Sequence, residues 1–285
     1  MSQSQFRSIS PTIWAFFATC LIVAATGGYI VGTLQTAPPK SHASADMHAP
    51  SAATSEAAAT SAPTNPPAAA GTGERAPVTD PKLLDATIFG GSGEVTSEET
   101  VTNIHRRNPK DPFAIGAIDA PVVISEFSDF ECPFCARHNN ETTPKILQEY
   151  VDKGLVRIEW NDLPINGEHA VAAAKAARAA AAQGKFHEFA TALYARSATI
   201  SGHPNNTLED FLEIATEVKV PDLEKFRAQA SDDTYDEVIE NAKQYATKLG
   251  LTGTPGFIVG TTFVSGAQPY EVFQQAIEQE LRKAN

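Results

Sequence analysis

The chain has 285 residues, three cysteines and a formal net charge of −12. Such acidity argues against a nucleic-acid partner, because binding a phosphate backbone needs an excess of positive charge. Three cysteines are too few for a framework of structural disulfides, so stapling of the fold by disulfides is not expected.

The N-terminal part contains an uncharged apolar run over residues 13–34. A membrane-spanning helix needs about 20 such residues, so the run predicts a single transmembrane anchor. Arg7 precedes the run and no charge follows it until Lys40. The positive-inside rule then places residues 1–12 in the cytoplasm and the rest of the chain outside. The predicted location is the cell membrane, with a single pass and an extracytoplasmic catalytic domain.

Two alternatives to an uncleaved anchor stay open. A cleaved signal peptide would use the small residues Ala43-Ser44-Ala45, although they lie well beyond the apolar run. A lipoprotein would carry its lipid on Cys20, although the apolar run continues past that residue.

Residues 35–80 are mostly alanine, serine, threonine and proline. A segment with so few large apolar side chains cannot offset its ordering entropy, so it is predicted to be a disordered linker. Residues 81–116 form a predicted N-terminal extension, in which Ser97 caps a short helix. The basic cluster His105-Arg106-Arg107 is expected to be the solvated end of that helix.

The globular domain is predicted over residues 117–285. Val122–Phe127 is an apolar, β-branched strand, and a helix follows it to about Lys153, with a kink expected at Pro144. Leu155–Trp160 has the composition of a second strand. A strand, a helix and a second strand in this order predict a parallel crossover.

A block of helices is predicted over residues 167–249, and a hairpin and a closing helix follow it. Gly253–Gly260 and Thr261–Gly266 form the predicted hairpin, and Pro269–Lys283 has the apolar spacing of an amphipathic helix. The pattern predicts an α/β domain with one mixed sheet and helices on both faces.

Cys132 and Cys135 stand where the first strand gives way to its helix. Residues three apart on a helix share a face, close enough for a disulfide after small adjustment. The helix N-terminus favours a thiolate on Cys132, and Pro133 suits the first helical turn. A static disulfide or part of a metal site with His138 are the alternatives, but three candidate ligands do not complete a metal site. The pattern therefore favours redox chemistry without a cofactor or a metal.

Several motifs together resemble the DsbA-like thiol-disulfide oxidoreductases of the thioredoxin superfamily, above all their membrane-tethered Gram-positive and actinobacterial forms. The resemblance extends over about residues 111–281 and implies a thioredoxin fold with an inserted helical domain at about 167–249. The motifs are Asp119–Ile124, Phe127–Cys135, Asp162-Leu163-Pro164, Gln183–Phe189 and Leu249–Pro255.

The resemblance also implies roles for individual residues. Cys132 takes the position of the exposed nucleophile, and Cys135 that of the buried resolving thiol. Pro255 matches the cis-proline of the family, and Thr254 the residue before it that faces the cysteines. Glu126 matches a partly buried acid that relays protons for the buried thiol.

The residues around the cysteines bear on the direction of the reaction. The intervening dipeptide is Pro133-Phe134, whereas the best-known oxidases of the family have histidine at the second position. Phe134 offers no positive charge to the thiolate, and Asp129 and Glu131 are expected to oppose it. The sequence therefore predicts a pKa for Cys132 above the value of about 3.5 in DsbA, and a milder oxidant.

The predicted function is the introduction of disulfides into secreted or envelope proteins through exchange at Cys132–Cys135. The expected partners are unfolded or partly folded secreted proteins with free cysteines, together with a quinone-coupled membrane protein that re-oxidises the pair. An envelope disulfide reductase or isomerase is the main alternative. A membrane-tethered binding or chaperone module without redox turnover is the second alternative.

Overall fold

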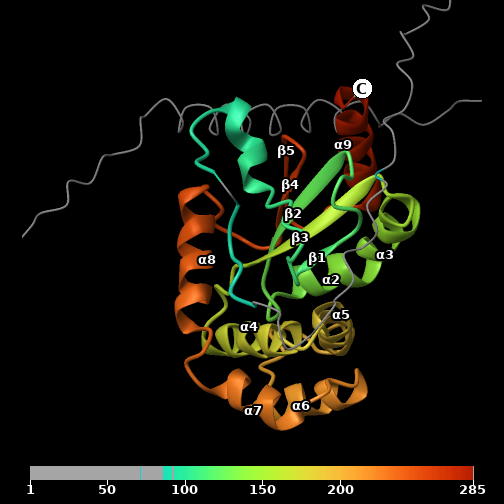
Figure 1. The fold of residues 1–285 in the computed structure, drawn as a ribbon. Coiled ribbons are helices and arrows are strands. Elements are labelled where there is room, and N and C mark those ends of the chain that lie inside the picture. The colour runs from blue at the N-terminus through green and yellow to red at the C-terminus, as the bar shows by residue number, and fades with distance from the viewer. Residues whose placement is uncertain (1–70, 72–85, 92, 285) are drawn as a thin grey trace, which may run out of the picture. The chain divides into compact units, whose positions relative to one another are not determined.

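The computed structural model describes residue 71, residues 86–91 and residues 93–284 (Figure 1). The predicted cytoplasmic segment and transmembrane anchor, and all of the predicted linker except Gly71, lie outside the described residues. Within the described ranges, no helix is both long and apolar enough to cross a bilayer. The strands are β1 (Ala114–Ile115), β2 (Val122–Ser128), β3 (Val156–Asp162), β4 (Gly256–Val259) and β5 (Thr262–Ser265).

The helices lie in four parts of the chain. The 3-10 helix η2 (Glu98–Ile104) precedes the sheet, and α9 (Tyr270–Lys283) closes the chain. Between β2 and β3 lie α2 (Pro133–Glu141), α3 (Thr143–Ile146) and the π-helix η3 (Leu147–Val151). Between β3 and β4 lie α4 (Glu168–Ala181), α5 (Phe186–Ser197), α6 (Leu208–Glu217), α7 (Leu223–Ser231) and α8 (Asp236–Lys248).

The five strands form one sheet in the order β1-β3-β2-β4-β5. β2 and β3 run parallel, whereas β1 is antiparallel to β3, β4 to β2 and β5 to β4. The predicted parallel crossover and mixed sheet are confirmed. The sequence does not predict β1, because two residues carry no readable alternation. This strand lies within the segment assigned to the N-terminal extension.

Alternate residues of the central strand β2 face two different layers, as side chains on a strand do. Ile124 belongs to a core cluster with Phe273 and Ile277 of α9. Phe127 belongs to another cluster with Ala246 of α8. Figure 1 shows α8 and α9 on opposite sides of the sheet. All seven residues of β2 are buried, so the strand that leads to the cysteines is enclosed on both faces.

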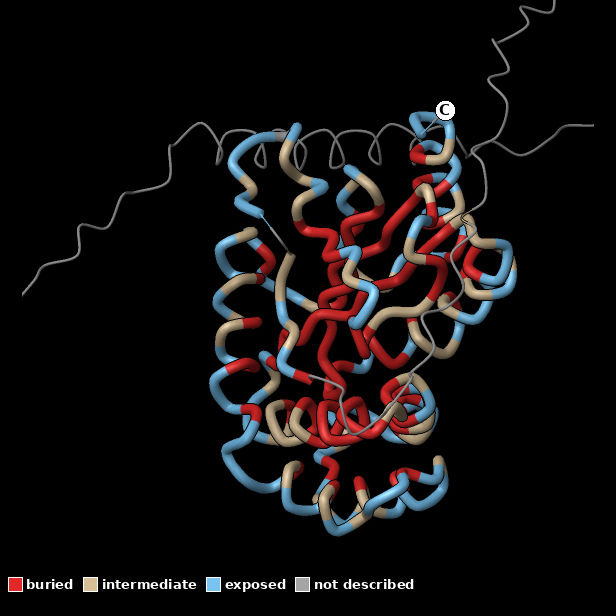
Figure 2. The backbone as a smooth tube through the Cα atoms, viewed as in Figure 1, coloured by how far each residue is buried: buried red, intermediate tan, exposed pale blue. Residues whose placement is uncertain are grey.

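Helices α4 to α7 gather beyond one end of the sheet (Figure 1). Helix α4 is buried along most of its length, whereas α6 and α7 contain many exposed residues (Figure 2). The alanines of α4 explain its burial, because a methyl side chain lets neighbouring helices approach closely. Ala173, Ala176 and Ala180, for example, have no exposed surface.

The expected kink at Pro144 is instead a break between two helices. Helix α2 ends at Glu141, and Pro144 lies in the first turn of α3. Proline has no backbone N–H to donate, so a new first turn accommodates it without losing a hydrogen bond.

Two of the three residues in the basic cluster before β1 are buried, so the prediction of a solvated helix end is wrong for His105 and Arg106, whereas Arg107 is exposed. His105 and Arg106 are 7% and 8% exposed. The Arg106 guanidinium contacts Asp111 at 2.5 Å, and its backbone N–H donates to Glu159 of β3 at 2.6 Å. The His105 ring hydrogen-bonds the Ser125 hydroxyl on β2 at 2.9 Å. The buried charge of Arg106 is tolerated here because the Asp111 carboxylate pairs with its guanidinium.

Candidate active site

Cys132 caps the N-terminus of α2, and Cys135 lies one turn further along the helix. Pro133 occupies the first helical turn, as predicted. The backbone N–H of Ala136 donates to the Cys132 carbonyl at 3.1 Å, which starts the helical ladder. Cys132 is 6% exposed and Cys135 has no exposed surface, and both are free thiols in this structure. The pair therefore combines one sulfur near the surface with one enclosed sulfur.

The Cys132 sulfur is surrounded by hydrogen-bond donors that stabilise its thiolate. The pKa of Cys132 falls from 9.0 to about 6, chiefly because the Cys135 thiol hydrogen-bonds it. Burial opposes this fall in the pKa, while the backbone N–H groups of Phe134 and Cys135 support it. These two N–H groups belong to the unpaired donors of a helix N-terminus. Cys132 is consequently a thiolate over most of the neutral pH range.

Cys135 has the opposite electrostatic environment. Its pKa is raised well above the ordinary thiol value, first by burial and then by the neighbouring Cys132. Burial in an apolar environment disfavours the charged form of any thiol. The two sulfurs are thus chemically distinct: one is ready to attack or to be attacked, and the other stays protonated.

The Thr254–Pro255 peptide bond is cis, as the resemblance implies. Pro255 directly precedes β4, which pairs with β2 so that Gly256 lies opposite Phe127. This register brings the loop before β4 next to the cysteines. The Cys132 thiol lies 3.4 Å from the Thr254 carbonyl oxygen. The structure therefore places Thr254 and Pro255 beside the sulfur that is nearer the surface.

Glu126 lies on β2 with only 3% of its surface exposed. Burial raises the pKa of its carboxyl from 4.5 to about 7. Its Oε1 atom has no hydrogen-bond partner among the described residues. A buried carboxyl with one unsatisfied oxygen is costly, so Glu126 is a candidate for function rather than for stability.

Phe134 is the exposed residue that follows Pro133 in the dipeptide. Its side chain is 56% exposed, and the Arg137 guanidinium lies over its ring at 5.2 Å. Arg137 also donates to the Ala267 carbonyl at 2.8 Å, in the loop before α9. The dipeptide thus presents an apolar ring to solvent next to Cys132.

The acidic residues Asp129 and Glu131 are buried and bind loops. The Asp129 carboxylate accepts hydrogen bonds from the backbone N–H of Ile165 at 2.8 Å and of Asn166 at 3.0 Å. The Glu131 carboxylate accepts from the backbone N–H of Asn205 at 2.7 Å. The sequence indicates two acids near the thiolate but not these donors, because each donor lies more than 30 residues away.

The site also contains residues that the sequence does not single out. Ser128 and Tyr194 are buried, and their hydroxyl oxygens lie 3.1 Å apart. His203 hydrogen-bonds the Glu131 carbonyl at 2.8 Å, directly before Cys132. No local pattern reveals these contacts, since each partner is far away in the chain.

His138 does not complete a metal site with the two cysteines. Its ring packs at a tilt against the rings of Phe257 and Phe273, with centroids 4.4 Å and 4.7 Å away. Its Nδ1 atom has no hydrogen-bond partner among the described residues. Burial lowers the pKa of His138 to about 3. Within the described ranges, no group of three His, Cys, Asp or Glu side chains could hold a metal ion.

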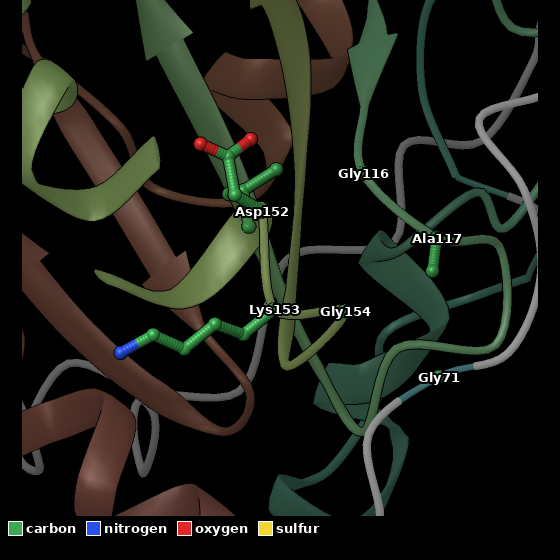
Figure 3. Close-up of a pocket in the computed structure, with 7 residues that line it drawn as sticks. Gly71, Gly116, Ala117, Asp152, Lys153 and Gly154 are labelled. Atoms are coloured by element: carbon green, nitrogen blue, oxygen red, sulfur yellow. The ribbon is translucent and has the colours of Figure 1, made fainter. Parts of the chain in front are cut away.

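A separate hollow lies elsewhere on the domain (Figure 3). It contains none of the predicted site residues, and the Lys153 side chain extends away from Gly116 and Ala117. This hollow offers no thiol and is not a candidate for the redox site. Its lining consists of Gly71, Gly116, Ala117, Val151, Asp152, Lys153 and Gly154.

The fold and the cysteine pair define the class of protein as a thiol-disulfide oxidoreductase. A family model described as thioredoxin matches residues 108–279. The match extends over more than half of the chain, so the chain belongs to this thioredoxin family.

Individual relatives agree with this assignment. The probable disulfide bond formation protein D of Bacillus cereus is 28% identical over 174 residues, which cover 60% of this chain and 79% of that protein. The oxidised BdbD structure from Bacillus subtilis has a TM-score of 0.56 at 22% identity and covers 68% of this chain and 100% of its own. A thioredoxin-like oxidoreductase from Silicibacter pomeroyi DSS-3 has a TM-score of 0.50 at 33% identity, covering 60% of this chain and 92% of its own. The predicted resemblance to the DsbA-like oxidoreductases is confirmed.

Proposed function

We propose that this protein donates disulfides to secreted or envelope proteins outside the cytoplasm, through exchange at Cys132–Cys135. The observation that carries the proposal is the difference between the two sulfurs. The pKa of Cys132 is lowered to about 6, and the pKa of the buried Cys135 is raised. A stable Cys132 thiolate favours the reduced pair and so makes the oxidised pair reactive toward substrate thiols.

The exchange proceeds in two steps. A substrate thiolate attacks the Cys132 sulfur of the oxidised pair, the Cys132–Cys135 bond breaks, and Cys135 leaves with the electron pair. A second substrate thiolate then attacks the substrate sulfur of the mixed disulfide and releases Cys132 as a thiolate. The substrate has lost two electrons, and the pair is reduced.

Glu126 supplies the proton that the leaving Cys135 requires. A carboxyl with a pKa of about 7 is partly protonated at neutral pH, which suits a group that both gives and takes protons. Thr254 and Pro255 flank the Cys132 sulfur and would face the substrate backbone. The exposed Phe134 ring offers an apolar contact to an unfolded substrate.

The strength of the oxidant follows from the Cys132 thiolate. At pH 7, a thiol pKa lowered from 9.0 to about 6 stabilises the reduced pair by about 1.4 kcal/mol, or about 30 mV for a two-electron couple. The cysteine pKa of about 3.5 in DsbA stabilises its reduced pair by more than this. The smaller stabilisation here therefore supports an oxidant milder than DsbA. The name of the Bacillus cereus relative, a probable disulfide bond formation protein, favours the donating direction.

The location and the redox partner belong to the same proposal. The apolar run over residues 13–34 would anchor the chain, and the linker over residues 35–80 would hold the catalytic domain off the membrane. Helices α4 to α8 would form the inserted helical domain of the family fold. The reduced pair would be re-oxidised by a quinone-coupled membrane protein.

The test is oxidative refolding of a reduced, unfolded protein by the purified, oxidised full-length chain. We expect the wild-type chain to restore the disulfides of the test protein, and Cys132→Ser to abolish this activity. Cys20→Ser is the matched control and should keep full activity. Reduction of the test protein without oxidation would favour a reductase, and an effect that survives in Cys132→Ser would favour a binding module.

A further inference from the structure

Two buried hydroxyl groups lie in the core beneath the cysteine pair. Ser128 ends β2 and is 1% exposed, while Tyr194 on α5 has no exposed surface. Their oxygen atoms are 3.1 Å apart, and this is a hydrogen bond in which either group could donate. A buried pair of this kind, next to a reactive thiol and an acid, calls for a role beyond packing.

Ser128 interacts electrostatically with both Glu126 and Cys135. Glu126 and Ser128 are two residues apart on a strand, so their side chains share one face of the sheet. The Ser128 hydroxyl interacts with the Glu126 carboxyl and also with the Cys135 thiol, and lowers the pKa of each. Ser128 is therefore the side chain that links the acid to the buried sulfur.

The bonding capacity of a serine hydroxyl matches these three neighbours. Such a hydroxyl has one proton to donate and two lone pairs that accept. If Tyr194 donates to Ser128, the Ser128 proton remains available for the Cys135 sulfur, and the second lone pair remains available for the Glu126 proton. Burial, together with the charges of Cys135 and Glu126, raises the pKa of Tyr194, so its hydroxyl stays protonated and able to donate.

Tyr194 is held in place by contacts that do not involve its hydroxyl. Its ring packs against Phe130 with centroids 5.0 Å apart, and against Trp160 at 6.1 Å. The side-chain amide of Asn140 on α2 donates to its backbone carbonyl at 2.9 Å. These contacts fix α5 against the helix that carries the cysteines, and they leave the hydroxyl group to Ser128.

We propose that Ser128 passes the proton from Glu126 to Cys135, and that Tyr194 is the positioning residue that orients the Ser128 hydroxyl. The proposal rests on the proposed function. When a substrate thiolate bonds to Cys132, the disulfide breaks and Cys135 leaves as a thiolate. Ser128 gives its proton to the Cys135 sulfur and takes the Glu126 proton, which leaves Glu126 as a carboxylate. Solvent later reprotonates Glu126.

Among the described residues, the charged or titratable groups near this path include Asp129 after β2 and Cys132 at the start of α2. Asp162 on β3 pairs with Ser128 in the sheet and forms an ion pair with Arg178 on α4. His138 on α2 packs against Phe257, which lies opposite Glu126 in the sheet. Asp129 and Asp162 have their own donors in Asn166 and Arg178. Ser128 is thus a described residue that interacts with both ends of the proton transfer.

The experiment measures how fast reduced glutathione opens the Cys132–Cys135 disulfide of the full-length chain, as a function of pH and in heavy water. We expect Ser128→Ala to slow this step at pH 7 by about tenfold, which is less than the usual contribution of about 100-fold or more from a general acid. Tyr194→Phe should slow it by a smaller factor, and Ser128→Thr, which keeps a hydroxyl, should restore most of the rate. The wild-type rate should fall in heavy water, and Ser128→Ala should lose this isotope effect.

Two matched controls lie outside the proton path. Ser125→Ala removes a hydroxyl from the other face of β2, where it bonds His105. Tyr245→Phe removes a phenol hydroxyl from α8. Both should leave the rate and its pH profile unchanged.

The outcomes separate this proposal from the proposed function. An oxidised wild-type chain that does not exchange with glutathione or with a test protein would overturn the proposed function itself. An active wild-type chain with no solvent isotope effect would overturn the relay, whether or not the variants fold. Equal rates and pH profiles in wild type, Ser128→Ala and Tyr194→Phe would also overturn it.

Discussion

Replacing Glu126 by glutamine should stabilise the folded protein, and the gain should depend on pH in a defined way. The carboxyl is fully enclosed by β2 and its neighbours, and burial raises its pKa from 4.5 to about 7. This rise corresponds to roughly 3 kcal/mol, at about 1.4 kcal/mol for each pKa unit. Ionised Glu126 therefore weakens the fold, and neutral glutamine of the same shape removes that cost.

The sign follows from proton binding in the two states. Below pH 4.5 the carboxyl is protonated in both the folded and the unfolded state, so the variant gains no stability over the wild type. Between pH 4.5 and about 7 the unfolded chain loses the proton and the folded chain keeps it, so the wild type becomes steadily less stable relative to the variant. Above pH 7 both states are ionised, and the gain should level off at roughly 3 kcal/mol.

The assay is urea unfolding of both reduced proteins at a series of pH values. Titration of Cys132 affects wild type and Glu126→Gln alike, so it cancels in the difference between their free energies of unfolding. Glu271→Gln, at an exposed position on α9, is the matched control and should show no such rise with pH. A difference between wild type and Glu126→Gln that is equal at pH 4 and pH 8 would refute the reasoning.

Two further predictions concern the thiolate and the buried ion pair. Phe134→His should lower the pKa of Cys132 by about one unit, because an added cation favours the thiolate. Ultraviolet absorbance of the thiolate against pH measures this, and an unchanged midpoint would contradict it. In the wild type, the Arg178 guanidinium lies 2.5 Å from the buried Asp162 carboxylate. Arg178→Met should destabilise the fold by about 3–5 kcal/mol, since it leaves this buried carboxylate without its cationic partner. Arg196→Met, which removes a more exposed partner of Asp210, should cost at most about 1 kcal/mol in urea unfolding.

Local signals in the sequence account for the parts of the site that were predicted well. The cysteine spacing, Pro133 and the strand before them lie within one continuous segment, so short-range helix and strand rules apply. The same holds for β4, β5 and α9, whose observed positions follow the predicted ones. Pro255 lies far from the cysteines in sequence, and only the family motif indicated that its peptide bond is cis.

Contacts between distant segments explain what the sequence could not show. Glu131 and Asp129 read as charges that oppose the thiolate, but backbone donors from two later loops bind their carboxylates. Arg106 is predicted to be solvated, but its guanidinium donates to the backbone carbonyl of Trp160, 54 residues later. Tyr194 lies within the predicted block of helices but is not singled out by the sequence, and only the folded chain brings its hydroxyl to Ser128.

The reduction potential of the Cys132–Cys135 pair, measured against a glutathione series, tests the proposed disulfide donor most directly. A lowered pKa at Cys132 and a buried, protonated Cys135 stabilise the reduced pair. We predict a potential less negative than about −200 mV, but more negative than the value of about −120 mV for DsbA. A more negative potential, approaching the value of about −270 mV for thioredoxin, would contradict disulfide donation and indicate a reductase.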